Sequence, residues 1–252
     1  MKKDTIQFQA ALFGDFAAIQ PNAETIRYFM EEFSDLQLIP SVLEQPEPKE
    51  RSGFTLRIGP DIRFLFRSDD GRWVVNFGNT RIDVLNVKKS PESPDLDNSE
   101  MFISLCLKLF GPIDARFVGD YSRLSFIARH FILEATEQDI RGFFKERFIA
   151  GSFYSENIPK EWQFRLVSRK PFDFKDDEEV NVVTQMMTKD VTMNRESGIE
   201  TFEGIECSFD INTAQEKSEN RFTLGHFESF LGEAATLEQK LQSEVLNYAE
   251  YK

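Results

Sequence analysis

Residues 53–87, GFTLRIGPDIRFLFRSDDGRWVVNFGNTRIDVLNV, decide the fold because apolar and polar residues alternate through four short runs. A period of two predicts half-buried β-strands. The runs are separated by residues that favour tight turns, namely Gly59-Pro60-Asp61, Asp69-Asp70-Gly71 and Gly78-Asn79. Connections this short do not allow crossovers, so we predict an antiparallel meander of four neighbouring strands.

The polar face of this predicted meander carries four arginines, Arg57, Arg63, Arg67 and Arg81, whose parity is opposite to that of the apolar residues. Guanidinium groups on one surface favour binding of an anion, such as a phosphate, a nucleic acid or an acidic partner. The alternative is a solvated sheet face on which the arginines pair with Asp and Glu, as Arg81 and Asp83 of one strand would. Both interpretations stay open at this point.

Length and composition indicate a globular protein with a core rich in phenylalanine. The chain has 252 residues, enough for one large domain or two small ones, and 26 Phe against 5 Tyr and 2 Trp. Phenylalanine buries a large area without a polar group that needs a partner. The formal net charge of −13 disfavours binding to bulk nucleic acid or to an anionic membrane, and it suits a basic protein partner.

The two cysteines, Cys106 and Cys207, lie in apolar contexts and are expected to be free, buried thiols in a reducing compartment. The start of the chain lacks the apolar run of a signal peptide, and no stretch of 18 apolar residues occurs. We therefore expect a cytoplasmic protein that does not associate with a membrane.

The rest of the chain predicts further strands and helices around the meander. Strands are expected at 5–13, 36–43, 162–168, 180–193 and 202–211, and as a hairpin at 115–118 and 123–134. Helices are expected after the N-caps Asn22 and Thr136, from 98 or 99 up to Gly111-Pro112, and over 223–248. The longest helix is therefore the last one, and it must pack across a sheet.

This order of elements resembles the β-α-β4-α unit that occurs twice in the TATA-binding-protein fold, and less closely the helix-grip folds. The resemblance implies an α+β protein with an antiparallel sheet and a long C-terminal helix across it. It also implies two halves, 1–112 and 113–252, packed together as one globular unit. An analogy of element order indicates an architecture and no activity.

Residues that carry chemistry are few. His130 and His226 lack the spacing to Cys, Asp or Glu that a zinc site needs, so each is predicted to be a core or helix-start residue. Motifs for a nucleophilic serine or cysteine and for a glycine-rich phosphate loop do not occur. The acidic pairs lie in segments rich in turn formers, which is typical of solvated loops. We expect no catalytic residue, no metal and no cofactor.

These observations favour a non-enzymatic cytoplasmic binding protein that recognises a protein partner, as an immunity protein, antitoxin, adaptor or assembly subunit does. One alternative is a binder of nucleic acid or of a phosphorylated ligand through Arg57, Arg63, Arg67 and Arg81. A second alternative is a binder of a small apolar ligand in a Phe-lined pocket between the sheet and the last helix. The sequence indicates neither the partner's identity nor the oligomeric state.

Overall fold

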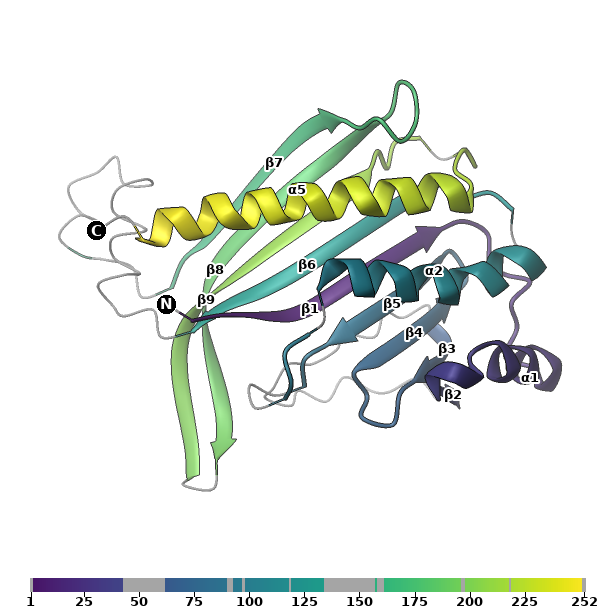
Figure 1. The fold of residues 1–252 in the computed structure, drawn as a ribbon, viewed down its shortest axis with the longest axis horizontal. Helices are drawn as coiled ribbons and strands as arrows, with labels where there is room; N and C mark the ends of the chain where they lie inside the picture. The colour runs from purple at the N-terminus through teal and green to yellow at the C-terminus, as the bar shows by residue number, and fades with distance from the viewer. Residues whose placement is uncertain are drawn as a thin grey trace.

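The described part of the chain forms one antiparallel sheet whose helices all lie on the same face (Figure 1). A computed structural model describes residues 2–42, 62–89, 93–96, 98–117, 119–133, 157, 161–195, 198–217 and 219–250. Within these residues the sheet has nine strands, and the long C-terminal helix crosses it. The expected α+β class with an antiparallel sheet is therefore confirmed.

The elements follow the chain in an order of strand, helix, strands, helix, and then strands and a final helix. The strands are β1 (Lys2–Phe13), β2 (Ile39–Val42), β3 (Ile62–Arg67), β4 (Trp73–Gly78), β5 (Arg81–Val87), β6 (Arg123–Leu133), β7 (Gln163–Pro171), β8 (Glu179–Arg195) and β9 (Gly198–Thr213). The helices are α1 (Ala23–Glu32), the short 3-10 helix η1 (Ser34–Leu36), α2 (Ser99–Arg116) and α5 (Leu224–Glu250).

The first strand occupies the centre of the sheet, whose order is β2-β3-β4-β5-β1-β6-β9-β8-β7. Strand β1 pairs with β5 on one side and with β6 on the other, and all pairs are antiparallel. The strands of the first half therefore lie on one side of β1, and those of the second half on the other. The far part of the β8–β9 hairpin projects beyond its neighbours (Figure 1), because β6 pairs with β9 only from Ile205 to Asn212.

The period-two pattern directs one apolar set toward the helices, and we call this side the helix-bearing face. In β1 this set is Phe8, Ala10 and Leu12, and all three are buried. The helices contribute their own stripe, in which the fully buried residues include Phe29, Phe102, Phe110, Phe227 and Phe230. The predicted Phe-rich core is thus the layer between sheet and helices. Burial of each such side chain contributes about 1.5–3 kcal/mol.

Aromatic rings make many of the contacts in this layer. Phe64 of β3 and Phe77 of β4 are cross-strand partners, with stacked rings 4.5 Å apart between centroids. Phe29 of α1 lies 4.9 Å from Phe77, and Phe110 of α2 meets Phe227 of α5 edge-on at 5.1 Å. Such pairs add about 0.5–1.5 kcal/mol beyond the area they bury. These ring contacts join neighbouring strands, α1 to the sheet, and α2 to α5.

Helix starts agree with the sequence because their capping residues are recognisable. Asn22 accepts a hydrogen bond from the backbone N–H of Thr25 at 2.9 Å, and Asn98 accepts one from Met101 at 2.9 Å. Each bond satisfies an N–H group that lacks a partner within the helix. The turn between β3 and β4 also has the expected conformation, with Gly71 at a φ of 65°.

The end of α2 differs from the prediction. We expected Gly111-Pro112 to stop this helix and residues 115–118 to form a strand, but the helix continues to Arg116 with Pro112 inside it. Ile113 is fully buried and extends the apolar stripe of Leu109 and Phe110, so packing favours another helical turn. The carbonyl of Pro112 also accepts a hydrogen bond from the hydroxyl of Tyr28 at 2.9 Å.

Other predicted elements differ in extent or lie outside the description. Residues 36–43 contain the end of η1 and the short strand β2 rather than one continuous extended run. The predicted strand at 53–59 and the predicted helix after Thr136 lie outside the described residues. The remaining strands and the C-terminal helix lie within a few residues of their expected bounds.

Gly204 of β9 lies where no side chain fits. A Cβ atom at this position would lie 2.4 Å from the ring of Phe131 and 2.7 Å from the carbonyl oxygen of Ile132. Phe131 is buried in β6, the neighbouring strand. Its ring covers the glycine, an arrangement that fills the gap a strand glycine leaves.

We expect Gly204→Ala to lower the free energy of unfolding by about 1–3 kcal/mol, because the methyl group pushes the Phe131 ring and the β6 backbone away from β9. Gly232→Ala is the matched control, since a Cβ at this exposed position of α5 meets nothing within 4 Å. The control is expected to stabilise the protein by about 0.5–1 kcal/mol. Urea unfolding followed by circular dichroism measures both, and equal effects would contradict the packing of Phe131 on Gly204.

Candidate binding surfaces

Two members of the predicted arginine stripe, Arg67 and Arg81, lie on the sheet face opposite the helices, which we call the helix-free face, but they lie far apart. Arg67 ends β3, and its row of cross-strand partners passes through Val74 to Leu85. Arg81 lies on the same strand as Leu85, four residues away, which is about 14 Å along the strand. Arg57 lies outside the described residues, and Arg63 belongs to β3.

Arg81 instead shares a row with Arg123, an arginine that the sequence did not single out. Arg81, Phe13 and Arg123 are cross-strand neighbours on β5, β1 and β6. Each guanidinium carbon lies 4.8 Å from the centroid of the Phe13 ring, so the ring has a cation on each side. A pair of guanidinium groups around an aromatic ring is an arrangement that can bind a carboxylate or a phosphate.

A carboxylate partly neutralises this pair, and an amide oxygen accepts a hydrogen bond from it. Asp83 accepts hydrogen bonds from Arg81 Nε at 2.8 Å and from Gln9 Nε2 at 2.7 Å. Burial raises the pKa of Asp83 even though both partners favour its ionised form. Arg123 donates to Asn212 Oδ1 at 3.0 Å, while its Nε is buried without an acceptor among the described residues. Burial lowers the pKa of Arg123, and nearby Arg81 acts in the same direction.

The helix-free face of the first half is less solvated than the arginine parity suggested. A second apolar cluster lies here, formed by the buried residues Leu65, Val74, Leu85 and Val87. Asn76 and Asp83 on the same face are also buried. The helix-free face of β3–β5 therefore combines arginines with buried apolar and polar side chains.

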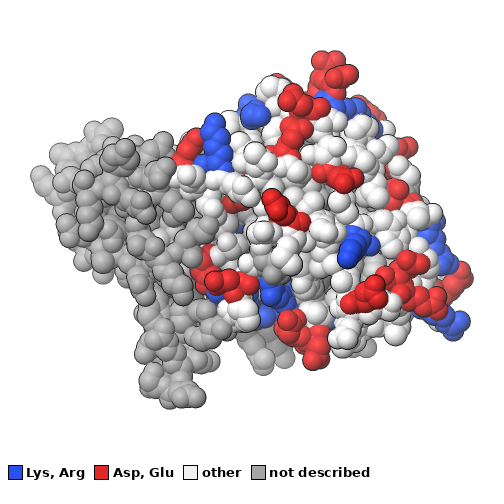
Figure 2. Space-filling model, in the orientation of Figure 1, with Lys and Arg blue, Asp and Glu red and all other residues white. Residues whose placement is uncertain are grey.

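Part of the excess of acidic residues lies on the helix-bearing face. Figure 2 shows Asp and Glu side chains spread over this face, with Lys and Arg side chains interspersed among them. For example, Nη2 of Arg116 in α2 lies 2.6 Å from Oε1 of Glu24 in α1, and the Arg116 guanidinium lies over the ring of Tyr28. Such exposed pairs contribute little to stability.

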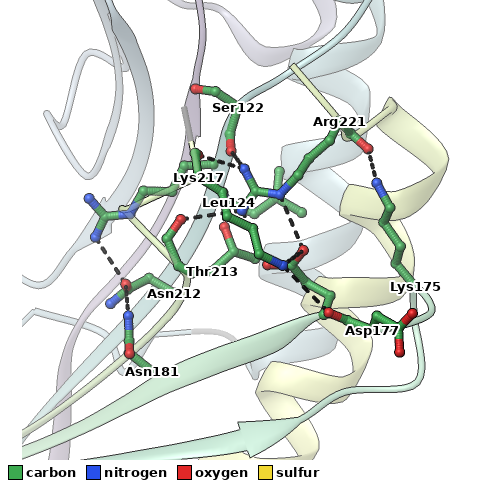
Figure 3. A network of polar contacts seen from close by, with 12 residues as sticks. Ser122, Leu124, Lys175, Asp177, Asn181, Asn212, Thr213, Lys217 and Arg221 are labelled. Carbon is green, nitrogen blue, oxygen red and sulfur yellow. Dashed lines mark hydrogen bonds and ion pairs between the residues drawn. The ribbon is translucent and has the colours of Figure 1, made fainter. Parts of the chain in front are cut away.

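A network of polar contacts around Arg221 joins three connections at one end of the sheet (Figure 3). Arg221, just before α5, contacts both carboxylate oxygens of Glu178, with Nε–Oε2 at 3.2 Å and Nη2–Oε1 at 3.1 Å. The same guanidinium donates to the carbonyls of Ser122, Lys217 and Ala214. The pair therefore links the β7–β8 connection, the segment before β6 and the segment before α5.

Neighbouring cations set the ionisation of Glu178. Burial alone would raise the pKa of this carboxyl, but the hydrogen bonds and charges of Arg221 and Lys217 outweigh it and hold the pKa below its usual value. Lys217 Nζ lies 3.3 Å from Glu178 Oε2. Because Glu178 and Arg221 bind each other and Arg221 also donates to backbone carbonyls, we assign this cluster a structural role.

The histidines and cysteines occupy the environments predicted for them. His130 is buried, with Nε2 2.7 Å from Glu238 Oε1 on α5, and His226 accepts a hydrogen bond from the N–H of Thr223 near the start of α5. Burial raises the pKa of both buried thiols, that of Cys207 to about 12, so neither is a reactive thiolate at neutral pH. In the described ranges no three His, Cys, Asp or Glu side chains are placed to hold a metal ion.

The two edges of the sheet differ in what they offer to a partner. Edge strand β2 has four residues and contains Pro40, which lacks an N–H donor. Edge strand β7 has nine residues, almost all exposed, and no other described strand pairs with its outer side. Leu166 and Val167 at its middle are 55% and 52% exposed. Strand β7 is therefore the candidate protein-binding surface.

Comparisons with known proteins do not assign the chain to a family, since no family model matches it and no curated protein matches it at a significant level. None of the described helices is both long and apolar enough to cross a membrane.

We predict that Glu178→Gln lowers the free energy of unfolding at pH 7 by about 3 kcal/mol, because Arg221 keeps its burial but loses its counter-charge. The lowered pKa of Glu178 means that its contribution is complete above about pH 4.5 and is lost as the pH falls through the folded-state pKa. Urea unfolding at pH 7, 5 and 3.5 should therefore show the two proteins converging in acid.

Glu216→Gln is the control for this measurement, because Glu216 pairs with Arg169 at an exposed position. Removing its charge is expected to leave the stability unchanged at neutral pH. A stability difference between wild type and Glu178→Gln that stays constant down to pH 3.5 would contradict the proposed ionisation of Glu178.

Proposed function

We propose that this chain is a non-enzymatic binding protein of the cytoplasm that recognises another protein, in the manner of an immunity protein, antitoxin, adaptor or assembly subunit. The observation that supports this most directly is the long, exposed edge strand β7 with Leu166 and Val167 at its centre. Proteins usually shorten, cover or interrupt their edge strands, since an open edge pairs with other chains. A nine-residue edge without an internal proline is suited to a protein partner.

The architecture that accompanies this proposal is a duplicated one. The first half contributes β1, α1, β2–β5 and α2, and the second half contributes β6, β7–β9 and α5, with β1 and β6 side by side at the centre. This arrangement supports two equivalent units of the TATA-binding-protein type. In such a pair the two outer edges are β2 and β7, of which only β7 is long among the described strands.

The test is a pull-down of the tagged protein from its native lysate, with and without nuclease, followed by mass spectrometry. We expect a stoichiometric protein partner that survives nuclease and is lost when Leu166→Ser is combined with Val167→Ser. The control variant Met30→Ser with Met101→Ser removes two other exposed apolar side chains and should retain the partner. Recovery of no stoichiometric protein from the lysate would contradict the proposal.

A second candidate function is the binding of a nucleic acid or a phosphorylated ligand, which the Arg81–Phe13–Arg123 row favours. Here a base or a phosphate would contact the aromatic ring and the two cations on the helix-free face.

This second function predicts that labelled single-stranded DNA and RNA oligonucleotides bind at low salt and lose affinity steeply as salt increases. Arg81→Glu combined with Arg123→Glu should abolish the binding measured by fluorescence anisotropy. Arg27→Glu with Lys108→Glu gives the same change in net charge at exposed helical positions and should retain most of it. Oligonucleotides that do not bind at low salt, or that bind both variants equally, would exclude this function.

A further inference from the structure

No other described strand pairs with the outer side of β7, and its side chains are exposed on both of its faces. It pairs with β8 from Gln163↔Met187 to Pro171↔Glu179, so each residue of β7 has a known neighbour on one side. In an antiparallel pair, every second residue directs its N–H and C=O to the neighbour, and the residues between direct theirs outward. An extended segment can therefore add to β7 as a tenth strand and satisfy these groups.

The exposed side chains of β7 define what such a segment must contain. Val182 and Met186 of β8 lie on the helix-bearing face, so their neighbours Ser168 and Phe164 lie there too, together with Leu166. The helix-free face of β7 carries Arg165, Val167 and Arg169. Each face thus offers an exposed apolar side chain at the middle of the strand.

Positive charge is concentrated on this strand. Its sequence, QFRLVSRKP, has three basic residues and no acidic one, although the whole chain has 43 acidic against 30 basic residues. The cross-strand neighbours on β8 are neutral, since Arg165 faces Gln185 and Arg169 faces Asn181. Arg169 also contacts Glu216, but both side chains are more than half exposed, and such a pair exchanges partners readily.

Charge argues against a second copy of this chain as the occupant in the register centred on Val167. Two β7 strands paired antiparallel about Val167 would place Arg165 of one copy directly opposite Arg169 of the other, on both sides of the axis. Like charges directly opposite each other across a strand pair are destabilising. An acidic segment in the same position would meet both arginines with opposite charge.

We infer that the partner adds an extended acidic strand to β7. In it, carboxylates lie opposite Arg165 and Arg169, and apolar residues lie opposite Leu166 and Val167. This inference rests on the proposed protein-binding function and specifies its mode. The backbone hydrogen bonds supply affinity, while the apolar contacts and the two arginines select the sequence.

The probe is a phage-displayed library of random dodecapeptides, selected on the folded protein. Enriched peptides are synthesised with a fluorophore, and their affinities are measured by anisotropy. We expect sequences in which Asp or Glu flanks a pair of apolar residues. Arg165→Glu combined with Arg169→Glu should weaken them at least about tenfold. Arg27→Glu with Lys108→Glu is the charge-matched control and should bind within about twofold of wild type.

Strand addition has a second signature that charge reversal does not test. N-methylation of alternate peptide residues removes the N–H groups that face β7 and should abolish binding, while methylation of the intervening residues should be tolerated. Thermal melts followed by circular dichroism establish that each variant is folded.

Three results would overturn the inference. The first is a selection that yields no binding peptide. The second is a selection that yields basic or neutral peptides, which bind the charge-reversed protein as tightly as wild type. The third is an equal effect of both methylation patterns on binding. The proposed function fails separately, by the absence of any stoichiometric partner in the lysate. A partner that is recovered equally by wild type and by Arg165→Glu with Arg169→Glu would leave that function intact and exclude β7 as its site.

Discussion

The double pairing of β1 is the constraint on which the rest of this structure depends. Strand β1 hydrogen-bonds to β5 on one side and to β6 on the other, so one twelve-residue strand joins the two halves of the sheet. Its apolar residues on the helix-bearing face, among them Phe8 and Ala10, lie under the helices, and both Ala10 and Ala11 are fully buried. Because a strand between two neighbours has no free backbone groups, the open edges move outward to β2 and β7.

Local signals in the sequence account for the strands and the helix starts. Alternation and turn residues located β3, β4 and β5, and Asn22 and Asn98 located two helix starts, because these patterns act within a few residues. The end of α2 was predicted incorrectly, since the burial of Ile113 outweighs the stop signal of Gly111-Pro112. Burial of one residue depends on segments far away in the chain, and such contacts leave no local pattern.

The candidate sites likewise depend on local patterns that the sequence shows and on contacts between distant segments that it does not show. Parity placed Arg67 and Arg81 on one sheet face, but only the strand order shows that Arg81 lies near Arg123 and not near Arg67. Strand β7 was expected at nearly its observed position, yet nothing within its own sequence marks it as an edge. Its excess of basic residues was visible in the sequence and becomes informative only with its place in the sheet. The Glu178–Arg221 pair likewise joins residues from segments 43 positions apart.

The central place of β1 has a consequence for the order in which the chain folds. During synthesis β1 leaves the ribosome before the other described strands, and β5 can pair with it as soon as residues 81–87 follow. Ala10 pairs with Phe126 of β6. The second side of β1 therefore remains unpaired until the residues between them have been synthesised. Pairing over such a separation is slow, and a bare strand edge invites association with other nascent chains. While the chain is being made, one edge of β1 is therefore exposed, although β6 covers that edge in the folded protein.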